Sequence, residues 1–283
     1  MSVPSFSLNA TEKTYPLLLK HFDGHPVNLN GAGNTLALEG PFISIVGSRQ
    51  MSAYGQKIVR LLIPALVRSG LTIVSGLAYG IDAFVHQIAL REGGMCVAVL
   101  GSGLKAIYPS VNRPLAAEIT KQGCLLSEYE DDVGPQQRYF PERNRIVAGI
   151  SPLTLIIEAG AKSGTLITAR MALNAGREVC VVPGDVTSPL TAGIHILLGE
   201  GAKAVRSAKE ILDLYGFPEI EASPLTCLTD EERELYALIP AGGVEIETLL
   251  VASHLSFPFL QAHLSALELK NAVYFHSHLW HKT

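Results

Sequence analysis

The sequence has little that would suit a secreted or membrane-bound protein. None of its apolar runs approaches the ~18 residues that a membrane span requires. The N-terminal stretch lacks the basic and apolar regions of a secretory signal. The four cysteines are Cys96, Cys124, Cys180 and Cys227, and they form no Cys-x-x-Cys pair. The first three lie within apolar, strand-like runs. We therefore expect a cytoplasmic protein with buried free thiols and no membrane partner.

Complete nucleotide-cofactor motifs are also absent. Residues 101–106 match the start of the dinucleotide fingerprint, but Pro109 follows soon after and no ribose-binding acid stands at the expected distance. Residues 160–165, GAKSGT, carry Lys162 before the last glycine, whereas a Walker A loop has its lysine after it. The sequence therefore predicts no cofactor.

Catalytic arrangements are equally scarce. His86 is the only histidine of the central segment before His195, and no Ser-His-Asp arrangement is evident. Asp82 and Glu158 could act as acid and base, although such residues more often accept hydrogen bonds from loop backbone. Histidines 276, 278 and 281 could hold a metal, but a solvated strand face is preferred because no further ligand cluster is evident. We predict neither catalytic nor metal-binding residues.

Positive charge is missing from the C-terminal part. Residues 225–283 hold three basic and seven acidic residues, whereas residues 1–224 hold nineteen of each. Because nucleic-acid binding needs basic surface, any such site must be a local patch on the larger part.

Apolar strand patterns alternate with helical patterns from about residue 41 to residue 215. The predicted strands are 43–46, 71–75, 95–100, 124–127, 153–158, 178–182 and 203–205. The predicted helices are 54–69, 79–92, 113–121, 165–175 and 192–198. This alternation is typical of an α/β fold, a mostly parallel sheet with helices on both faces. Ligands of such sheets bind at the carboxyl ends of the strands.

The flanking segments read differently. Residues 1–40 look loop-rich, with one short helix at 15–22 and turns at 28–34. A linker at 219–226 precedes three short helices at 230–238, 246–253 and 257–269 and a two-stranded wing at 272–280. We therefore predict a short extension over 1–40, an α/β domain over 41–218 and a winged-helix-like domain over 225–283.

The segment Ile43–Arg49, ISIVGSR, is the strongest candidate for a ligand site. A buried strand ends at Gly47 and Ser48, Arg49 follows, and a helix begins after Ser52. Free N–H groups at that helix start, the helix dipole and the guanidinium would all attract phosphate. The alternative is an ordinary strand-to-helix turn with a surface arginine.

Small residues follow other predicted strands as well. They lie at 75–82, at 101–103 and at 163–165, and they include Gly76, Ser163, Gly164 and Thr165. Such residues let the backbone approach a ligand closely. Because the segments share one sheet edge, they favour a polyanion or nucleotide site there.

A basic and aromatic segment, RYFPERNR, spans residues 138–145 and is continued by Lys162 and Arg170. Cations for phosphates beside an aromatic ring for stacking are what single-strand binding requires. The alternative is that Phe140 belongs to the core and that the arginines form a solvated helix face.

Together these motifs resemble the DNA-processing protein A family, also called Smf. The resemblance rests on IVGSR, SGLAYGID, GSGLKAIYPSVN, LLSEYE, FPERNRIVAGIS, EAGAKSGTLITAR and REVCVVPGD, in unbroken order from about residue 15 to 205. It implies an extended Rossmann-like fold and a homodimer without enzymatic activity. It also implies binding of single-stranded DNA, protection of that DNA in natural transformation, and loading of the RecA recombinase.

By position, the family's DNA pocket falls on residues 47–49, 140–145 and 162–165. With Gly76 and Arg138 added, the candidate nucleic-acid-binding residues are Gly47, Ser48, Arg49, Gly76, Arg138, Phe140, Arg143, Asn144, Arg145, Lys162, Ser163, Gly164 and Thr165. Two departures stand out. The chain has only about 40 residues where many members carry a helical N-terminal domain, and its C-terminal part is acidic, which favours a partner-binding or packing role there.

Two other functions compete with this interpretation. Distant Rossmann relatives that release bases from nucleoside monophosphates use a Gly-Gly-x-Gly-Thr loop followed closely by a glutamate. Residues 161–170, AKSGTLITAR, have no carboxylate after Thr165, which favours a binding protein over such a hydrolase. A regulator acting through the winged helix is disfavoured by the acidic C-terminal part.

Overall fold

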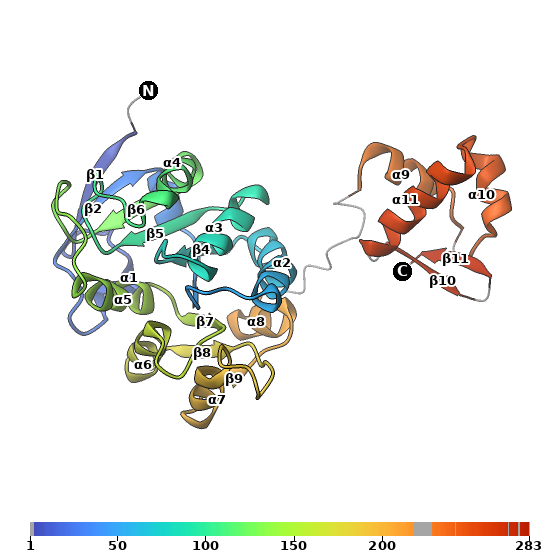
Figure 1. Ribbon diagram of the computed structural model, residues 1–283. Helices are drawn as coiled ribbons and strands as arrows, with labels where there is room; N and C mark the ends of the chain where they lie inside the picture. The colour runs from blue at the N-terminus through green and yellow to red at the C-terminus, as the bar shows by residue number, and fades with distance from the viewer. Residues whose placement is uncertain (1–2, 218–227, 241, 271, 277, 283) are drawn as a thin grey trace. The chain divides into compact units, whose positions relative to one another are not determined.

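The computed structural model describes residues 3–217, 228–240, 242–270, 272–276 and 278–282, and divides the chain into two compact units, residues 1–220 and 221–283 (Figure 1). In the described residues no helix is both long and apolar enough to cross a membrane.

The larger unit is built on one mixed sheet whose strands, in the described residues, follow the order β1-β2-β6-β5-β4-β3-β7-β8-β9. Their bounds are β1 (Ser5–Asn9), β2 (Asn28–Gly33), β3 (Phe42–Gly47), β4 (Thr72–Ser75), β5 (Cys96–Leu100), β6 (Cys124–Ser127), β7 (Leu153–Ile157), β8 (Glu178–Val181) and β9 (Lys203–Ala204). All neighbouring strands from β6 to β9 are parallel. The chain builds outward from β3 on one side and then returns to β7 on the other, so the topological switch point lies between β3 and β7.

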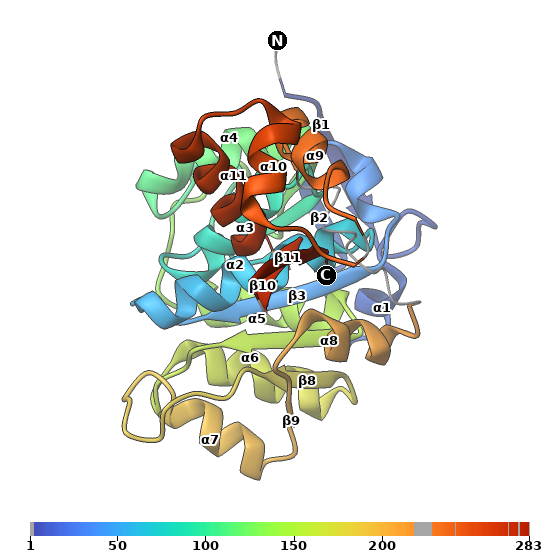
Figure 2. The ribbon, with the colours of Figure 1, turned by 90° about the vertical axis from the view of Figure 1, so that its right-hand side faces the viewer.

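Helices cover both faces of this sheet. Their bounds are α1 (Leu17–Lys20), α2 (Ala53–Arg68), α3 (Ile81–Arg91), α4 (Arg113–Gln122), α5 (Tyr139–Ile150), α6 (Gly164–Asn174), α7 (Ala192–Gly199) and α8 (Ala208–Tyr215), with 3-10 turns at Thr35–Leu38 and Ser110–Asn112. One apolar cluster joins Ile43 and Ile45 to α2, α3, α4 and α8. A second joins Val46 to α1, α5, α6 and α7, so α2 and α6 lie on opposite sides of β3 (Figure 2).

This arrangement confirms the predicted α/β fold. Every residue of β3 is buried, as expected of a strand covered on both faces. The strands and helices predicted between residues 43 and 205 are all present with small shifts at their ends. The sequence analysis did not predict helices α5 and α8.

The N-terminal segment differs from the prediction. The expected turns at 28–34 are instead β2, which pairs antiparallel with both β1 and β6, and the expected helix at 15–22 is only the four-residue α1. The sequence NLNGAG looks like a turn because glycine weakens strands. Here the glycines serve close packing: a Cβ at Gly31 would overlap the ring of Phe6, and one at Gly33 would overlap the carbonyl oxygen of Gly123.

The smaller unit contains α9 (Asp230–Ala237), α10 (Ile246–Ser253), α11 (Phe257–Leu269) and the antiparallel pair β10 (Val273–His276) and β11 (Leu279–Lys282). Leu235, Leu249 and Leu264 belong to its own apolar core. The predicted three helices and hairpin are therefore present, while the winged-helix assignment itself stays a prediction. The predicted linker at 219–226 lies outside the described residues.

Candidate nucleic-acid interface

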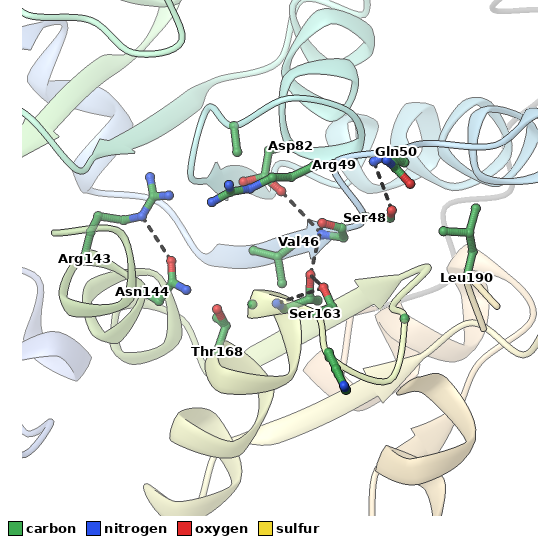
Figure 3. Close-up of a pocket in the computed structure, with 16 residues that line it drawn as sticks. Val46, Ser48, Arg49, Gln50, Asp82, Arg143, Asn144, Ser163, Thr168 and Leu190 are labelled. Atoms are coloured by element: carbon green, nitrogen blue, oxygen red, sulfur yellow. Dashed lines mark hydrogen bonds between the residues drawn. The ribbon is translucent and has the colours of Figure 1, made fainter. Parts of the chain in front are cut away.

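A cavity of about 520 Å³ opens beside the switch point between β3 and β7 (Figure 3). Its wall comes from the loop after β3, from the start of α6, from α5 and from the start of α3. The residues that line it are Val46, Gly47, Ser48, Arg49, Gln50, Ala78, Asp82, Arg143, Asn144, Gly160, Lys162, Ser163, Gly164, Thr165, Thr168 and Leu190. The predicted sheet edge thus holds a concave site.

The loop after β3 is fixed by close backbone contacts. A Cβ on Gly47 would overlap the carbonyl oxygen of Ile157, and one on Gly80 (φ +75°) would overlap that of Ser48. Ile81 donates its N–H to the Ser48 carbonyl at 3.1 Å. These contacts leave Ser48 buried and Arg49 exposed at the cavity wall.

The start of α2 is not open to phosphate, which corrects one expectation. Ser52 caps α2, and it donates its backbone N–H to Glu158 Oε2 at 3.0 Å and its hydroxyl to Glu158 Oε1. Glu158 is buried, so a carboxylate of this chain already occupies the helix start. The alternative interpretation of Glu158, a brace for loop backbone, is confirmed.

The start of α6 supplies the anion-attracting groups instead. Ser163 accepts the N–H of Thr165 at 3.2 Å and donates its hydroxyl to Thr165 Oγ1 at 2.9 Å. Thr165 in turn donates to the Gly47 carbonyl at 3.0 Å, which ties α6 to the loop after β3. Because Lys162 is exposed next to this helix start, its charge adds to the positive end of the helix dipole.

Arg143 is buried rather than exposed to solvent, although it lines the cavity. Its side chain donates to the carbonyl oxygens of Gly76 and Val99, just after β4 and within β5. A Cβ at Gly76 would overlap the guanidinium of Arg143. Burial lowers the pKa of Arg143 to about 10, and the nearby Asp82 carboxylate opposes that shift.

Asp82 is a buried carboxyl group near this arginine, and it lines the same cavity. It accepts the N–H of Gly47 at 3.4 Å, which confirms the interpretation of Asp82 as a brace for loop backbone. Burial raises the pKa of Asp82, while Arg143 and backbone N–H groups oppose the rise. Asp82 and Arg143 thus both line the cavity with little exposure to solvent.

Phe140 lies next to the cavity together with Arg49. The Arg49 guanidinium carbon is 5.6 Å from the centre of the Phe140 ring, within range of a cation–π contact. Phe140 is half-buried and also packs against Tyr108, with ring centres 5.4 Å apart. The structure thus joins two candidates that are 91 positions apart in the sequence. Stacking of Phe140 on a base remains a prediction.

Two other candidates lie outside the cavity wall. Arg138 is exposed and lies over the ring of its neighbour Tyr139 at 5.1 Å. Arg145 donates to the Gly24 carbonyl at 2.7 Å and pairs with Glu128, so it fastens the N-terminal segment to α5. Asn144 lines the cavity and accepts the Nε–H of Arg143 at 3.2 Å.

Sequence reasoning missed several lining residues, including Gln50, Thr168 and Leu190. Thr168 could have been found, because it lies one helical turn after Gly164 on the same face. Leu190 belongs to a loop that no motif analysis singled out. Over the described stretches, no group of three or more histidine, cysteine or acidic side chains is arranged to hold a metal ion.

Comparison with known proteins supports the family resemblance that the sequence motifs indicate. The family of DNA recombination-mediator protein A matches residues 7–216. Protein Smf of Escherichia coli is 42% identical over 205 residues, which are 72% of this chain and 55% of that protein. The chain thus spans little more than half the length of that relative.

Two solved structures are similar to the larger unit. DNA processing protein A of Streptococcus pneumoniae has a TM-score of 0.71 and 40% identity, covering 75% of this chain and 74% of that one. The protein of Helicobacter pylori, whose structure is described as giving insight into its single-stranded DNA binding mode, has a TM-score of 0.68 and 28% identity, covering 76% and 97%.

Proposed function

Since the chain belongs to the DNA recombination-mediator protein A family, which includes DNA processing protein A, we propose that it binds single-stranded DNA at the cavity beside β3 and β7. The observation that carries the proposal is the meeting of Arg49, Lys162, the start of α6 and the ring of Phe140 at one sheet edge. Phosphates would bind the cations and the helix start, and a base would stack on Phe140.

The pairing of the basic residues supports this assignment. Arg145, Arg170 and Arg206 each form an ion pair with a glutamate. Within the described parts of the chain, neither Arg49 nor Lys162 has an acidic partner, and both are exposed. Their charge is therefore available to neutralise DNA phosphates and release counterions.

The same geometry favours binding over catalysis. Asp82 and Glu158 both accept backbone N–H groups, which suits bracing of the loops better than proton transfer to a ligand. A hydrolase of the nucleoside monophosphate type would need a carboxylate soon after Thr165, where this chain has apolar residues, threonine and arginine. A non-enzymatic role therefore remains our proposal.

Family membership also supports a proposal about the wider biological role. We propose that the protein protects incoming single-stranded DNA during natural transformation, delivers it to the RecA recombinase, and acts as a homodimer. The acidic smaller unit would contribute contacts to a protein partner rather than to phosphates.

Replacing Arg49 tests the proposed site. Fluorescence anisotropy with labelled oligothymidylate should show weaker binding by Arg49→Ala and a salt slope reduced by about 0.7, the value for one phosphate on a single strand. The matched control is Arg206→Ala, which removes the same charge from an exposed ion pair outside the cavity wall. Equal affinity and equal slopes in the wild type and Arg49→Ala would refute the site.

A further inference from the structure

Two exposed tyrosine rings adjoin Phe140 beside the cavity. Tyr79 and Tyr108 line a crevice together with Arg49, Phe140 and Arg143, and they are 47% and 44% exposed. Neither phenolic hydroxyl takes part in a hydrogen bond with any other described residue, in contrast to Tyr15 and Tyr54, whose hydroxyls donate to the Pro26 and Pro183 carbonyls. Their rings therefore add little to the core and nothing to its hydrogen bonding.

The backbone segments that carry these two rings are tied to each other. Asn112 is buried and donates to the carbonyls of Leu77 and Ala78 at 2.9 and 3.3 Å, which ties the loop bearing Tyr79 to the segment bearing Tyr108. Leu77 has a φ of +53°, an uncommon conformation for a leucine. Strained backbone persists only where surrounding contacts enforce it, and such positions cluster at functional sites.

We propose that Tyr79 and Tyr108 continue the DNA-binding surface beyond Phe140 by stacking on bases of single-stranded DNA. The proposal rests on the proposed function, because the tyrosines share Arg49 with the cavity. A phosphate held at Arg49 would place a neighbouring base within reach of these rings, whose faces are sequence-tolerant stacking platforms. The bound ligand is thus a multi-nucleotide strand, with bases outside the cavity as well as beside it.

The test compares variants that remove the rings with variants that keep them. Tyr79→Ala with Tyr108→Ala should weaken binding of labelled oligothymidylate about fivefold or more at fixed salt, since each stacked base contributes to affinity. Tyr79→Phe with Tyr108→Phe should bind like the wild type. The salt slope should stay unchanged in both, unlike that of Arg49→Ala. Tyr274→Ala, which removes a similarly exposed ring from the smaller unit, is the matched control.

An oligonucleotide of abasic nucleotides separates stacking from backbone contacts. The wild type and the double alanine variant should bind it equally. A second measurement does not depend on the alanine variants: Tyr108→Trp in a Trp280→Phe background leaves one tryptophan, which oligothymidylate should quench.

The outcomes distinguish this inference from the function on which it rests. If the wild type does not bind oligothymidylate, the proposed function fails. If Arg49→Ala weakens binding but the double alanine variant does not, only the tyrosine surface is refuted. The tyrosine surface would also be refuted if the double alanine variant lost as much affinity for abasic strands as for oligothymidylate, or if oligothymidylate did not quench the tryptophan fluorescence. It would be refuted as well if the double alanine variant bound DNA normally but changed the molecular mass of the protein in solution, because that result would indicate a protein-docking surface.

Discussion

Replacement of Arg143 by methionine tests whether this residue positions the site or contacts DNA directly. The change removes donors to the carbonyls of Gly76 and Val99 and takes away a positive charge near the buried Asp82. Leaving a buried acceptor without its hydrogen bond costs about 1–3 kcal/mol, and the loss of a positive charge near the buried Asp82 adds to this cost. The free energy of unfolding of a natural domain is about 5–15 kcal/mol, so the variant should still fold. Its urea unfolding midpoint should be much lower than that of the wild type.

The stability of the Arg143→Met variant should also depend on pH in a definite direction. Burial already raises the pKa of Asp82, and Arg143 is the main charge that opposes the rise. Without Arg143 the folded-state pKa lies still higher, so the folded variant binds a proton more readily than the unfolded chain does. Its stability therefore increases as the pH falls through that raised pKa. The loss relative to the wild type should be larger at pH 7 than at about pH 5.

A double-mutant cycle completes the test. Asp82→Asn removes the buried charge. The double variant Arg143→Met with Asp82→Asn should therefore lose less free energy of unfolding than the sum of the losses in the two single variants. Arg138→Ala, an exposed arginine on the same segment, is the control and should leave the urea midpoint nearly unchanged. The reasoning fails if Arg143→Met unfolds like the wild type yet loses affinity for oligothymidylate, because that result would assign the guanidinium to DNA.

The remaining predictions concern Phe140 and the smaller unit. Phe140→Ala should weaken oligothymidylate binding by about 1–3 kcal/mol in anisotropy titrations; normal binding by a folded variant that melts early would instead assign the ring to the core. A chain ending at Ser223 should keep most of its affinity for single strands, since the cavity lies in the larger unit. The separate smaller unit, which carries the whole negative excess, should bind duplex DNA weakly or not at all at a fixed salt concentration, and micromolar or tighter binding would favour the regulator hypothesis.

The sequence predicted the central sheet and the edge that bears the site because both follow from local patterns. Runs such as Ile43–Val46 are buried on both faces, and parallel strands bring their carboxyl ends together wherever they occur. Strand β2 was not predicted from the sequence. Its glycines allow close contacts with Phe6 and Gly123, and no local sequence pattern reveals such contacts.

The roles of individual charged residues depended on packing that spacing could not supply. Arg143 and Arg145 are two positions apart, yet one reaches inward to two strand ends and the other outward to Gly24 and Glu128. Likewise, Glu158 blocks the start of α2 through Ser52, from 106 residues away in the chain. Which side of α5 faces the sheet, and which carboxylate reaches which helix, are set by the assembled core.

The place of β2 in the sheet also bears on how the protein is made. Strands β1 and β2 leave the ribosome well before β6, yet β2 pairs with β6, whose first residue follows about ninety positions later. At about 5–20 residues per second, the early hairpin waits roughly 5–20 seconds for that partner. During that interval one edge of β2 is unpaired and able to join another nascent chain. The high glycine content of NLNGAG, which weakens it as a strand, also makes it a poor template for such premature pairing.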